Sequence, residues 1–314
     1  GAFGAWRLST PVETRGELSV ALLQPNLTEE MRAAPGGAAG VYRSVMEQVR
    51  EASAAFPGLI VIPESALPAY WERSERLRQD LASIALSGPA ILFNDVEEGE
   101  GGRYYNAARL LTRDGLARAS YRKVHLVPFG EYVPLPKIFF FVRQISDEIG
   151  EFSAAPEPVL LRSGPLAIGV GICYEILYPS LIRREVADEA NLLATISNDS
   201  WYGRAGAQEQ HFAGAVLRSV ENSRYLLRAA ITGISGIVDP RGRIVAESEP
   251  DERRILTGTV ALREDRTAWT GWGEWIPRVA DVAALSVLLF GLARRFRVRR
   301  TRAELGAHDS RPLP

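Results

Sequence analysis

The stretch AIGVGICYE, residues 167–175, carries the pattern that decides the fold class. Its first six residues are apolar or glycine, as in a buried strand, which we predict to end at Ile172. Cys173 follows at once, ahead of a turn and of a helix predicted over residues 179–188. A cysteine at this elbow is exposed to solvent, and nearby backbone N–H groups can bind an oxyanion. The alternative is a buried, inert cysteine, which is the more frequent role of this residue.

The alternation of strand and helix continues outward from this stretch in both directions. Short apolar segments bounded by Gly, Pro, Asn or Asp predict strands, and apolar residues at helical spacing predict helices. The predicted strands are residues 18–23, 59–62, 91–93, 107–112, 119–121, 167–172, 192–197, 226–230, 236–238 and 255–260. The predicted helices are residues 40–56, 72–87, 179–188 and 208–223. Such alternation with nearly continuous apolar strands indicates an α/β protein with a mostly buried sheet.

Composition excludes several classes of protein. The chain has 314 residues, 46% of them hydrophobic, which is enough for a full-sized core. Its 37 basic and 38 acidic residues give a net charge of −1, so a generally basic nucleic-acid binder is excluded. A single cysteine excludes an intramolecular disulfide framework and a cysteine zinc site. The three histidines, His125, His211 and His308, are scattered along the sequence, which makes a histidine metal site improbable. We predict no metal and no cofactor.

Two more polar residues follow predicted strands. Glu64 closes the segment IVIPE, residues 60–64, and the carboxyl ends of buried strands are where α/β sheets collect active sites. Partial burial there raises the pKa of a carboxyl group and suits it to act as a general base. Lys123, one of only two lysines, follows the strand 119–121 and could stabilise an oxyanion. Taken alone, a glutamate at a strand end is usually structural, and a surface lysine is more common than a catalytic one.

The C-terminal region has a different character. Residues 282–293 form an uninterrupted apolar run of 12 residues, preceded by three Trp within residues 269–275 and followed by six Arg within residues 294–302. From Trp272 to Ala293 the segment has 22 residues, which predicts a transmembrane helix. The alternative is an amphipathic or core helix with a basic tail. If the helix spans a membrane, the positive-inside rule places the Arg cluster in the cytoplasm and the main domain on the other side.

A second apolar segment, PLPKIFFFVR, covers residues 134–143. Three consecutive Phe beside two Pro fit neither a helix face nor an alternating strand. One interpretation is a loop tucked into the core, and the other is an exposed apolar arm that contacts a membrane or an apolar substrate.

Taken together, these features resemble the nitrilase, or carbon–nitrogen hydrolase, superfamily, in which Glu, Lys and Cys follow three strands in this order. The resemblance covers about residues 18–260. The sequence motifs around the three residues are similar to those of the membrane-bound branch of the superfamily, the apolipoprotein N-acyltransferases. These motifs are PESALP (63–68), HLVPFGEYVP (125–134), ICYE (172–175), NDSWYG (198–203), QH (210–211) and RYLLRAAITGISGI (224–237).

The resemblance implies a catalytic triad. Glu64 would take the thiol proton as general base, Cys173 would be the nucleophile, and Lys123 would stabilise the tetrahedral oxyanion. A backbone N–H near Tyr174 would be the second oxyanion donor. A thiolate is both a good nucleophile and a good leaving group, so it can carry an acyl chain as a thioester.

Further residues match positions that matter in this family. Glu131 would support or orient the site, and Tyr174 and Glu175 would be supporting or substrate-binding residues. Trp201 is a candidate for lining the acyl pocket, whereas Asn198 and Asp199 most simply cap the turn. His211 and His125 are given structural roles.

The resemblance also implies fold, reaction and partners. The expected fold is a four-layer α-β-β-α sandwich, followed by the transmembrane helix. Residues 1–17 would link a missing N-terminal membrane region to the catalytic domain 18–268. Residues 269–293 would span the membrane and residues 294–314 would form a cytoplasmic tail. The implied reaction takes an acyl chain from a membrane phospholipid to the N-terminal amine of an apolipoprotein, in the bacterial inner membrane with a periplasmic catalytic domain. We expect a monomer, with no nucleic-acid partner.

Two alternatives stay open. An amidase or nitrilase would use the same triad on a small amide and pass the acyl group to water. In a non-catalytic, membrane-anchored binding module, Glu64, Lys123 and Cys173 would not have to lie close together.

Overall fold

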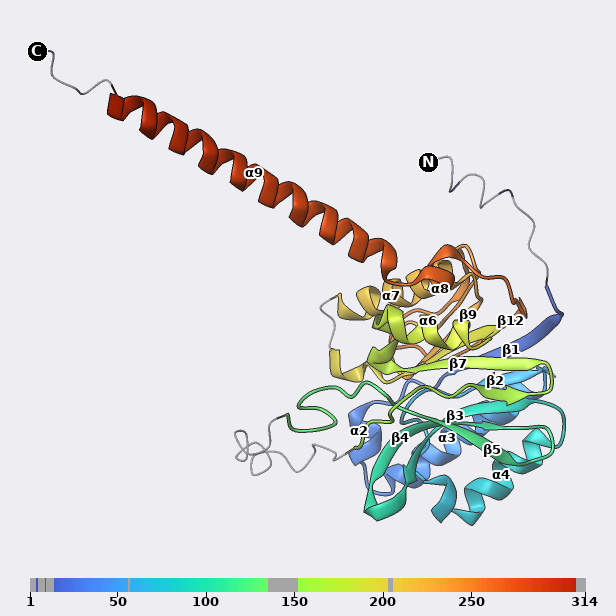
Figure 1. Ribbon diagram of the computed structural model, residues 1–314. Coiled ribbons are helices and arrows are strands. Elements are labelled where there is room, and N and C mark those ends of the chain that lie inside the picture. Colours follow the sequence, from blue (N-terminus) through green and yellow to red (C-terminus); the bar gives the residue numbers. More distant parts are fainter. Residues whose placement is uncertain are drawn as a thin grey trace, which may run out of the picture. The chain divides into compact units, whose positions relative to one another are not determined.

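The computed structural model describes residues 14–55, 57–134, 152–202 and 206–308, together with residues 4 and 9. Of residues 201, 202, 276 and 296–308 it describes the backbone alone. The contacts divide the chain into two units, residues 1–271 and residues 272–314. Among the described residues of the first unit, the strands form two six-stranded sheets (Figure 1).

The first sheet has the strand order β12-β1-β2-β3-β4-β5. Its neighbours β1, β2 and β3 run parallel, and β12, β4 and β5 join antiparallel. Parallel neighbours need a crossover, and the helices α3 and α4 provide it. The strands are β1 (Glu17–Gln24), β2 (Leu59–Val61), β3 (Ala90–Glu98), β4 (Tyr104–Leu111), β5 (Ala117–Arg122) and β12 (Arg254–Ala261). The helices are α2 (Glu29–Ala33), α3 (Gly37–Ser53) and α4 (Glu75–Ala85), with the 3₁₀ turns η1 (Trp71–Arg73) and η2 (Glu100–Gly102).

The second sheet, β11-β10-β9-β8-β7-β6, repeats this topology. Here β7, β8 and β9 run parallel, α6 and α7 are the crossovers, and β10, β11 and β6 join antiparallel. The strands are β6 (Leu161–Ser163), β7 (Leu166–Ile172), β8 (Leu192–Ser197), β9 (Leu226–Ala230), β10 (Gly236–Val238) and β11 (Ile244–Glu247). The helical segments are η3 (Cys173–Leu177), α6 (Pro179–Ala187), η4 (Asp199–Tyr202), α7 (Ala207–Asn222), α8 (Ala268–Trp272) and α9 (Trp275–His308).

Side chains on alternate strand positions separate the core into three layers. On β1, Val20 and Leu22 pack between the two sheets, whereas Ala21 and Leu23 pack under α3 and α4. A third cluster lies under α6 and α7 on the outer face of the second sheet. Both faces of the parallel strands are therefore buried, which is why these strands are apolar throughout. The layers α-β-β-α follow, as predicted, and Figure 1 shows α3 and α4 on one side and α6 and α7 on the other.

Most predicted elements are present, with shifted ends. Residues 192–197, 226–230 and 236–238 form the strands predicted for them. The prediction missed β6 and β11. Both lie at the edges of the second sheet and have only three and four residues, which is too short for a periodic pattern.

The predicted transmembrane helix is not confirmed. A helix, α9, does cover residues 275–308. Among the residues that the structure describes, none of the helices has a stretch long and apolar enough to cross a membrane. The physical reason is that the uninterrupted apolar run covers only residues 282–293, and Arg278, Asp281 and the following arginines bound it. The apolar segment 135–143 lies outside the described residues.

The core between the sheets predicts a large difference between two leucines. Leu22 is fully buried between the sheets, whereas Leu217, on α7, is 56% exposed. We expect Leu22→Ala to lower the free energy of unfolding by about 2–5 kcal/mol, because it leaves a cavity. The matched control Leu217→Ala should change it by no more than about 0.5–1 kcal/mol. Urea unfolding of both variants measures the difference, and equal losses would contradict the layer assignment.

Candidate active site

Cys173 lies at the end of β7, where the chain turns into η3. Its backbone has φ 53°, the left-handed region that non-glycine residues rarely adopt. The chain turns back closely here, since a Cβ on Gly171 would lie 3.3 Å from the backbone N of Ile176. The cysteine is 8% exposed and packs against the core between the sheets. The turn after β7 thus places the Cys173 thiol next to a cluster of buried polar side chains.

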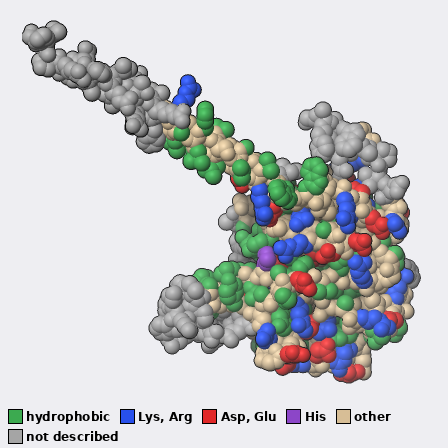
Figure 2. All heavy atoms as spheres, viewed as in Figure 1, with side chains coloured by type: hydrophobic (Ala, Val, Ile, Leu, Met, Phe, Trp, Pro, Cys, Tyr) green, Lys and Arg blue, Asp and Glu red, His purple; other side chains and the backbone are tan. Residues whose placement is uncertain are grey.

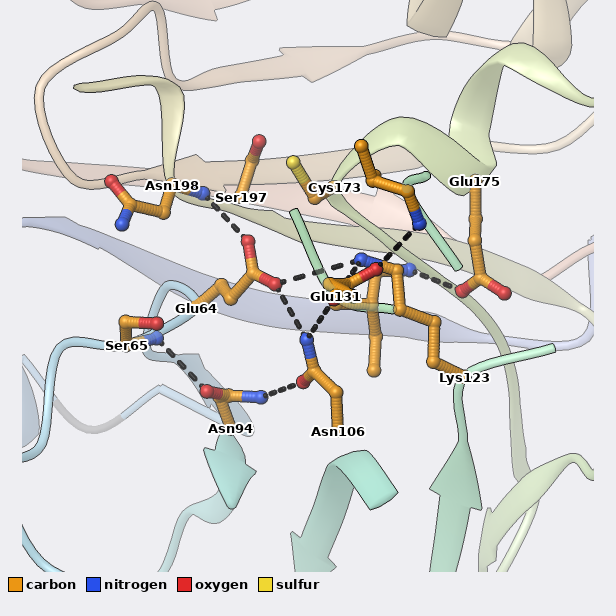
Figure 3. A network of polar contacts seen from close by, with 12 residues as sticks. Glu64, Ser65, Asn94, Asn106, Lys123, Glu131, Cys173, Glu175, Ser197 and Asn198 are labelled. Atoms are coloured by element: carbon orange, nitrogen blue, oxygen red, sulfur yellow. Dashed lines mark hydrogen bonds and ion pairs between the residues drawn. The ribbon is translucent and has the colours of Figure 1, made fainter. Parts of the chain in front are cut away.

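Glu64 follows β2 and is 6% exposed. One carboxylate oxygen, Oε2, accepts a hydrogen bond from the backbone N–H of Asn198 at 3.0 Å. The other, Oε1, accepts from Nδ2 of Asn106 at 2.8 Å. Asn198 follows β8 of the second sheet, so the two sheets meet at this carboxylate (Figure 3).

Lys123 follows β5 and is 1% exposed. Its Nζ donates to Oε1 of Glu131 at 2.8 Å and lies 3.8 Å from Oε1 of Glu64. Burial acts to lower the pKa of Lys123, but the two carboxylates outweigh it and raise that pKa above its ordinary value. The ammonium therefore stays charged at any physiological pH.

The environment of Cys173 favours the neutral thiol. Burial, followed by the nearby Glu64 carboxylate, raises the pKa of Cys173 to about 12, although Lys123 and Ser197 act in the opposite direction. At neutral pH the thiol keeps its proton. A base must take that proton before the sulfur can act as a nucleophile.

Glu131 is held in the same cluster as the three residues above. Its Oε1 accepts from both Lys123 and Asn106, and its Oε2 accepts from the backbone N–H of Val127 at 2.8 Å. The Glu131 carboxylate therefore holds the ammonium in place beside Glu64.

Glu175 is fully buried, and four donors occupy its carboxylate. Oε1 accepts from the backbone N–H groups of Val124 and His125 at 2.7 and 2.9 Å. Oε2 accepts from the Tyr121 hydroxyl at 2.8 Å and from the backbone N–H of Ile172 at 2.9 Å. Glu175 thus joins the segment after Lys123 to the end of the strand before Cys173. Both of its carboxylate oxygens are occupied by these hydrogen bonds, so its role is to support the site.

The remaining predicted residues are placed as follows. Tyr174 is 39% exposed, and its ring contacts that of Tyr178 at a centroid distance of 5.8 Å. The His125 ring packs edge-on against Tyr178 at 4.2 Å, in line with its predicted structural role. The Trp201 side chain lies outside the described residues.

Sequence reasoning missed Asn106 and Asn94. Asn106 on β4 donates to both Glu64 and Glu131, and its Oδ1 accepts from Nδ2 of Asn94 at 2.7 Å. Asn94 in turn accepts from the backbone N–H of Ser65 at 2.9 Å. The one signal was a polar residue in the middle of an apolar strand. Within the described part of the chain, His, Cys, Asp and Glu side chains form no group of three that could hold a metal ion.

The geometry fits nucleophilic catalysis of acyl transfer. A thiol, a carboxylate able to take its proton and a fixed ammonium able to neutralise an oxyanion lie in one buried cluster. Figure 3 shows Glu64, Lys123 and Glu131 turned toward one another, with the Cys173 side chain nearby, next to Ser197.

Comparison with known proteins gives a consistent result. An apolipoprotein N-acyltransferase of Geobacter metallireducens is 36% identical over 300 residues, covering 92% of this chain and 57% of that protein. One from Gloeobacter violaceus is 31% identical, covering 92% and 56%. The chain thus spans a little over half the length of these curated relatives.

Solved structures share the fold. An amidase from Nesterenkonia sp. superposes with a TM-score of 0.59 at 21% identity, covering 82% of this chain and 94% of that one. A carbon–nitrogen hydrolase from Helicobacter pylori gives 0.61 at 16% identity, covering 84% and 94%. The family model for carbon–nitrogen hydrolases matches residues 19–268. The chain therefore belongs to the carbon–nitrogen hydrolase family.

Proposed function

We propose that this chain is the catalytic part of an apolipoprotein N-acyltransferase. It takes an acyl chain from a membrane phospholipid and passes it, through a thioester on Cys173, to the N-terminal amine of the diacylglyceryl-cysteine of an apolipoprotein. The observation that carries this proposal is the buried cluster of Glu64, Lys123 and Cys173, in a chain whose relatives bear that name.

The first half-reaction forms the thioester. Glu64 takes the thiol proton, and the sulfur attacks the carbonyl carbon of the phospholipid ester. Lys123 and the backbone N–H of Tyr174 stabilise the negative oxygen of the tetrahedral intermediate. When this intermediate collapses, the carbon–oxygen bond to the glycerol breaks, Glu64 returns the proton to the leaving alkoxide, and the lysophospholipid departs.

The second half-reaction transfers the acyl chain. The neutral amine of the apolipoprotein attacks the thioester carbon, and Glu64 takes a proton from the attacking nitrogen. The carbon–sulfur bond then breaks, the amide forms, and the proton returns to the thiolate of Cys173. Glu131 and Asn106 keep Lys123 and Glu64 in place through both steps.

We also propose that α9 brings the enzyme to the bacterial inner membrane, with the residues up to 268 on the periplasmic side. Leu288, Leu289 and Phe290 are consecutive and 59%, 56% and 72% exposed, so apolar groups point in all directions from the helix axis. Figure 2 shows hydrophobic side chains along the described part of α9. A helix that is apolar on all sides is stable in a lipid or protein environment. The arginines of residues 294–302 suit contact with anionic lipid headgroups.

The alternative function is an amidase that passes the acyl group to water. The observation in its favour is the fold shared with solved amidases, at a more distant level of similarity. The triad is common to both proposals, so the acyl donor and the acceptor distinguish them.

The thioester predicts a mass gain on a single residue. After incubation with phospholipid in detergent, we expect the intact mass to rise by one acyl chain and hydroxylamine to reverse the gain. Because Cys173 is the only cysteine, Cys173→Ala should show no gain. If no adduct forms and the chain instead releases ammonia from small amides, it is an amidase.

The raised pKa of Cys173 predicts how a variant without the base responds to pH. At pH 7, Glu64→Gln should form the thioester about 10²–10⁴-fold more slowly, because the thiol loses its base. The pKa of Cys173 is about 12. Glu64→Gln loses the Glu64 charge, one cause of this raised pKa, but keeps burial, the largest cause, so the thiol still holds its proton at pH 7. The thiolate fraction of the variant therefore grows about tenfold with each pH unit while the pH stays well below that pKa. The rate of the variant should follow that growth, whereas the rate of the wild type should rise less steeply.

The matched control for this variant is Glu47→Gln, on an exposed position of α3. It should keep the wild-type rate and pH profile. Equal profiles for Glu64→Gln and the wild type would contradict the role of Glu64 as general base.

A further inference from the structure

A second buried polar cluster contacts the backbone of Cys173 and plays no part in the steps above. His211 on α7 is 3% exposed, and its Nε2 lies 3.0 Å from the backbone carbonyl oxygen of Cys173. A carbonyl oxygen only accepts, so Nε2 carries the hydrogen and donates it. The ring therefore contacts the main chain of the nucleophile.

The ring of His211 is fixed from behind by two fully buried charged side chains. Its Nδ1 lies 3.2 Å from Oδ1 of Asp199 and 3.1 Å from Nη2 of Arg228. Asp199 and Arg228 are themselves an ion pair, and Ser197 Oγ donates to Oδ1 of Asp199 at 2.5 Å. Burial acts to raise the pKa of Asp199, but Arg228 and the His211 ring outweigh it and hold that pKa well below its ordinary range.

The surrounding backbone leaves Asp199 little freedom. A Cβ on Gly233 would lie 2.2 Å from its Oδ2, so the connection between β9 and β10 packs directly against the carboxylate. Arg228 is tied down as well, since its Nε donates to the carbonyl oxygen of Ile234 at 3.0 Å. The position of the His211 ring is thus set by three elements of the second sheet.

Cys173 needs such support. Its φ of 53° is strained for a non-glycine residue and persists only where the surroundings enforce it. A released backbone would relax and turn the thiol away from Glu64. The same segment after β8 serves both partners, because Asn198 N–H holds Glu64 and the Asp199 side chain, through His211, holds Cys173.

We propose that His211, held by Asp199 and Arg228, is a positioning residue that fixes the Cys173 backbone so that its thiol faces the general base. This inference rests on the proposed function, since it concerns the nucleophile of that reaction. It assigns a task to a histidine outside the triad, acting through the backbone carbonyl of Cys173.

Two amide variants separate the contacts of the His211 ring. The amide nitrogen of His211→Gln takes the place of Nε2 and can still donate to the Cys173 carbonyl. The shorter amide of His211→Asn takes the place of Nδ1, reaches Asp199 and falls short of Cys173. Both keep a neutral polar group in the same cavity.

The readout is alkylation of Cys173 by iodoacetamide, followed by intact mass. The sulfur displaces iodide and Glu64 receives the thiol proton, so the rate reports the contact between thiol and base without any acyl donor. At pH 7 we expect His211→Asn to react at least about tenfold more slowly, out of the 10²–10⁴-fold that a general base contributes. Its rate should rise about tenfold per pH unit, as the titration of an unassisted thiol requires.

His211→Gln should keep most of the wild-type rate and the shallower pH profile. The proposal is overturned if folded His211→Asn reacts like the wild type, or if His211→Gln is as slow as His211→Asn. Failure of the acyltransferase proposal is distinguishable, because the wild type would then form no acyl adduct while the contrast between the two variants persisted.

Circular dichroism shows whether the variants fold. If His211→Asn does not fold, NMR of the wild type labelled with ¹⁵N-histidine tests the same contact. The three histidines give few enough imidazole signals to resolve. Alkylation of Cys173 should shift one Nε2–H signal, that of His211, because the carbonyl it holds moves. Unchanged imidazole signals would overturn the proposal.

Discussion

The structure depends on one buried ammonium group. Lys123 is 1% exposed, and a cation is tolerated there only because Glu131 and Glu64 lie within 2.8 and 3.8 Å of its Nζ. These two carboxylates would repel each other without it, and Asn106 further joins them by donating to both. Removal of Lys123 would leave two buried carboxylates without a counter-charge, so the ammonium is the group that holds the cluster together. That rigidity suits a site that must stabilise an oxyanion without rearranging.

The site forms where the two halves of the sandwich meet. Glu64, Asn106 and Lys123 come from the first sheet, whereas Cys173 and Asn198 come from the second. Glu175 crosses the same boundary, since its carboxylate binds the backbone of Val124 and of Ile172. The apolar core between the sheets, with Leu22, Val61, Val170 and Ile196 fully buried, therefore fixes the distance between Glu64 and Cys173.

The two halves share one topology without a visible sequence repeat. In each, three parallel strands are joined by two helices and continued by antiparallel strands. In the first half the functional carboxylate follows the second parallel strand, and in the second half the cysteine follows the first. The halves use the same physical feature, the carboxyl ends of buried strands, for different chemistry.

The sequence by itself determined the strand–helix alternation and the residues whose type announces their chemistry. Cys173, Lys123 and Glu64 stand out because each follows an apolar strand, and one cysteine and two lysines leave little choice. The roles of Asn106, Ser197 and Arg228 were decided only by tertiary structure. Asn106 and Arg228 lie on strands, and their charged partners are 25 to 42 residues away in the sequence, whereas Ser197 ends β8 and donates to Asp199 two residues further on. Local patterns report burial and local geometry. The pairing of buried polar groups depends on how the two sheets stack, and no short stretch of sequence encodes the distance between groups on different sheets.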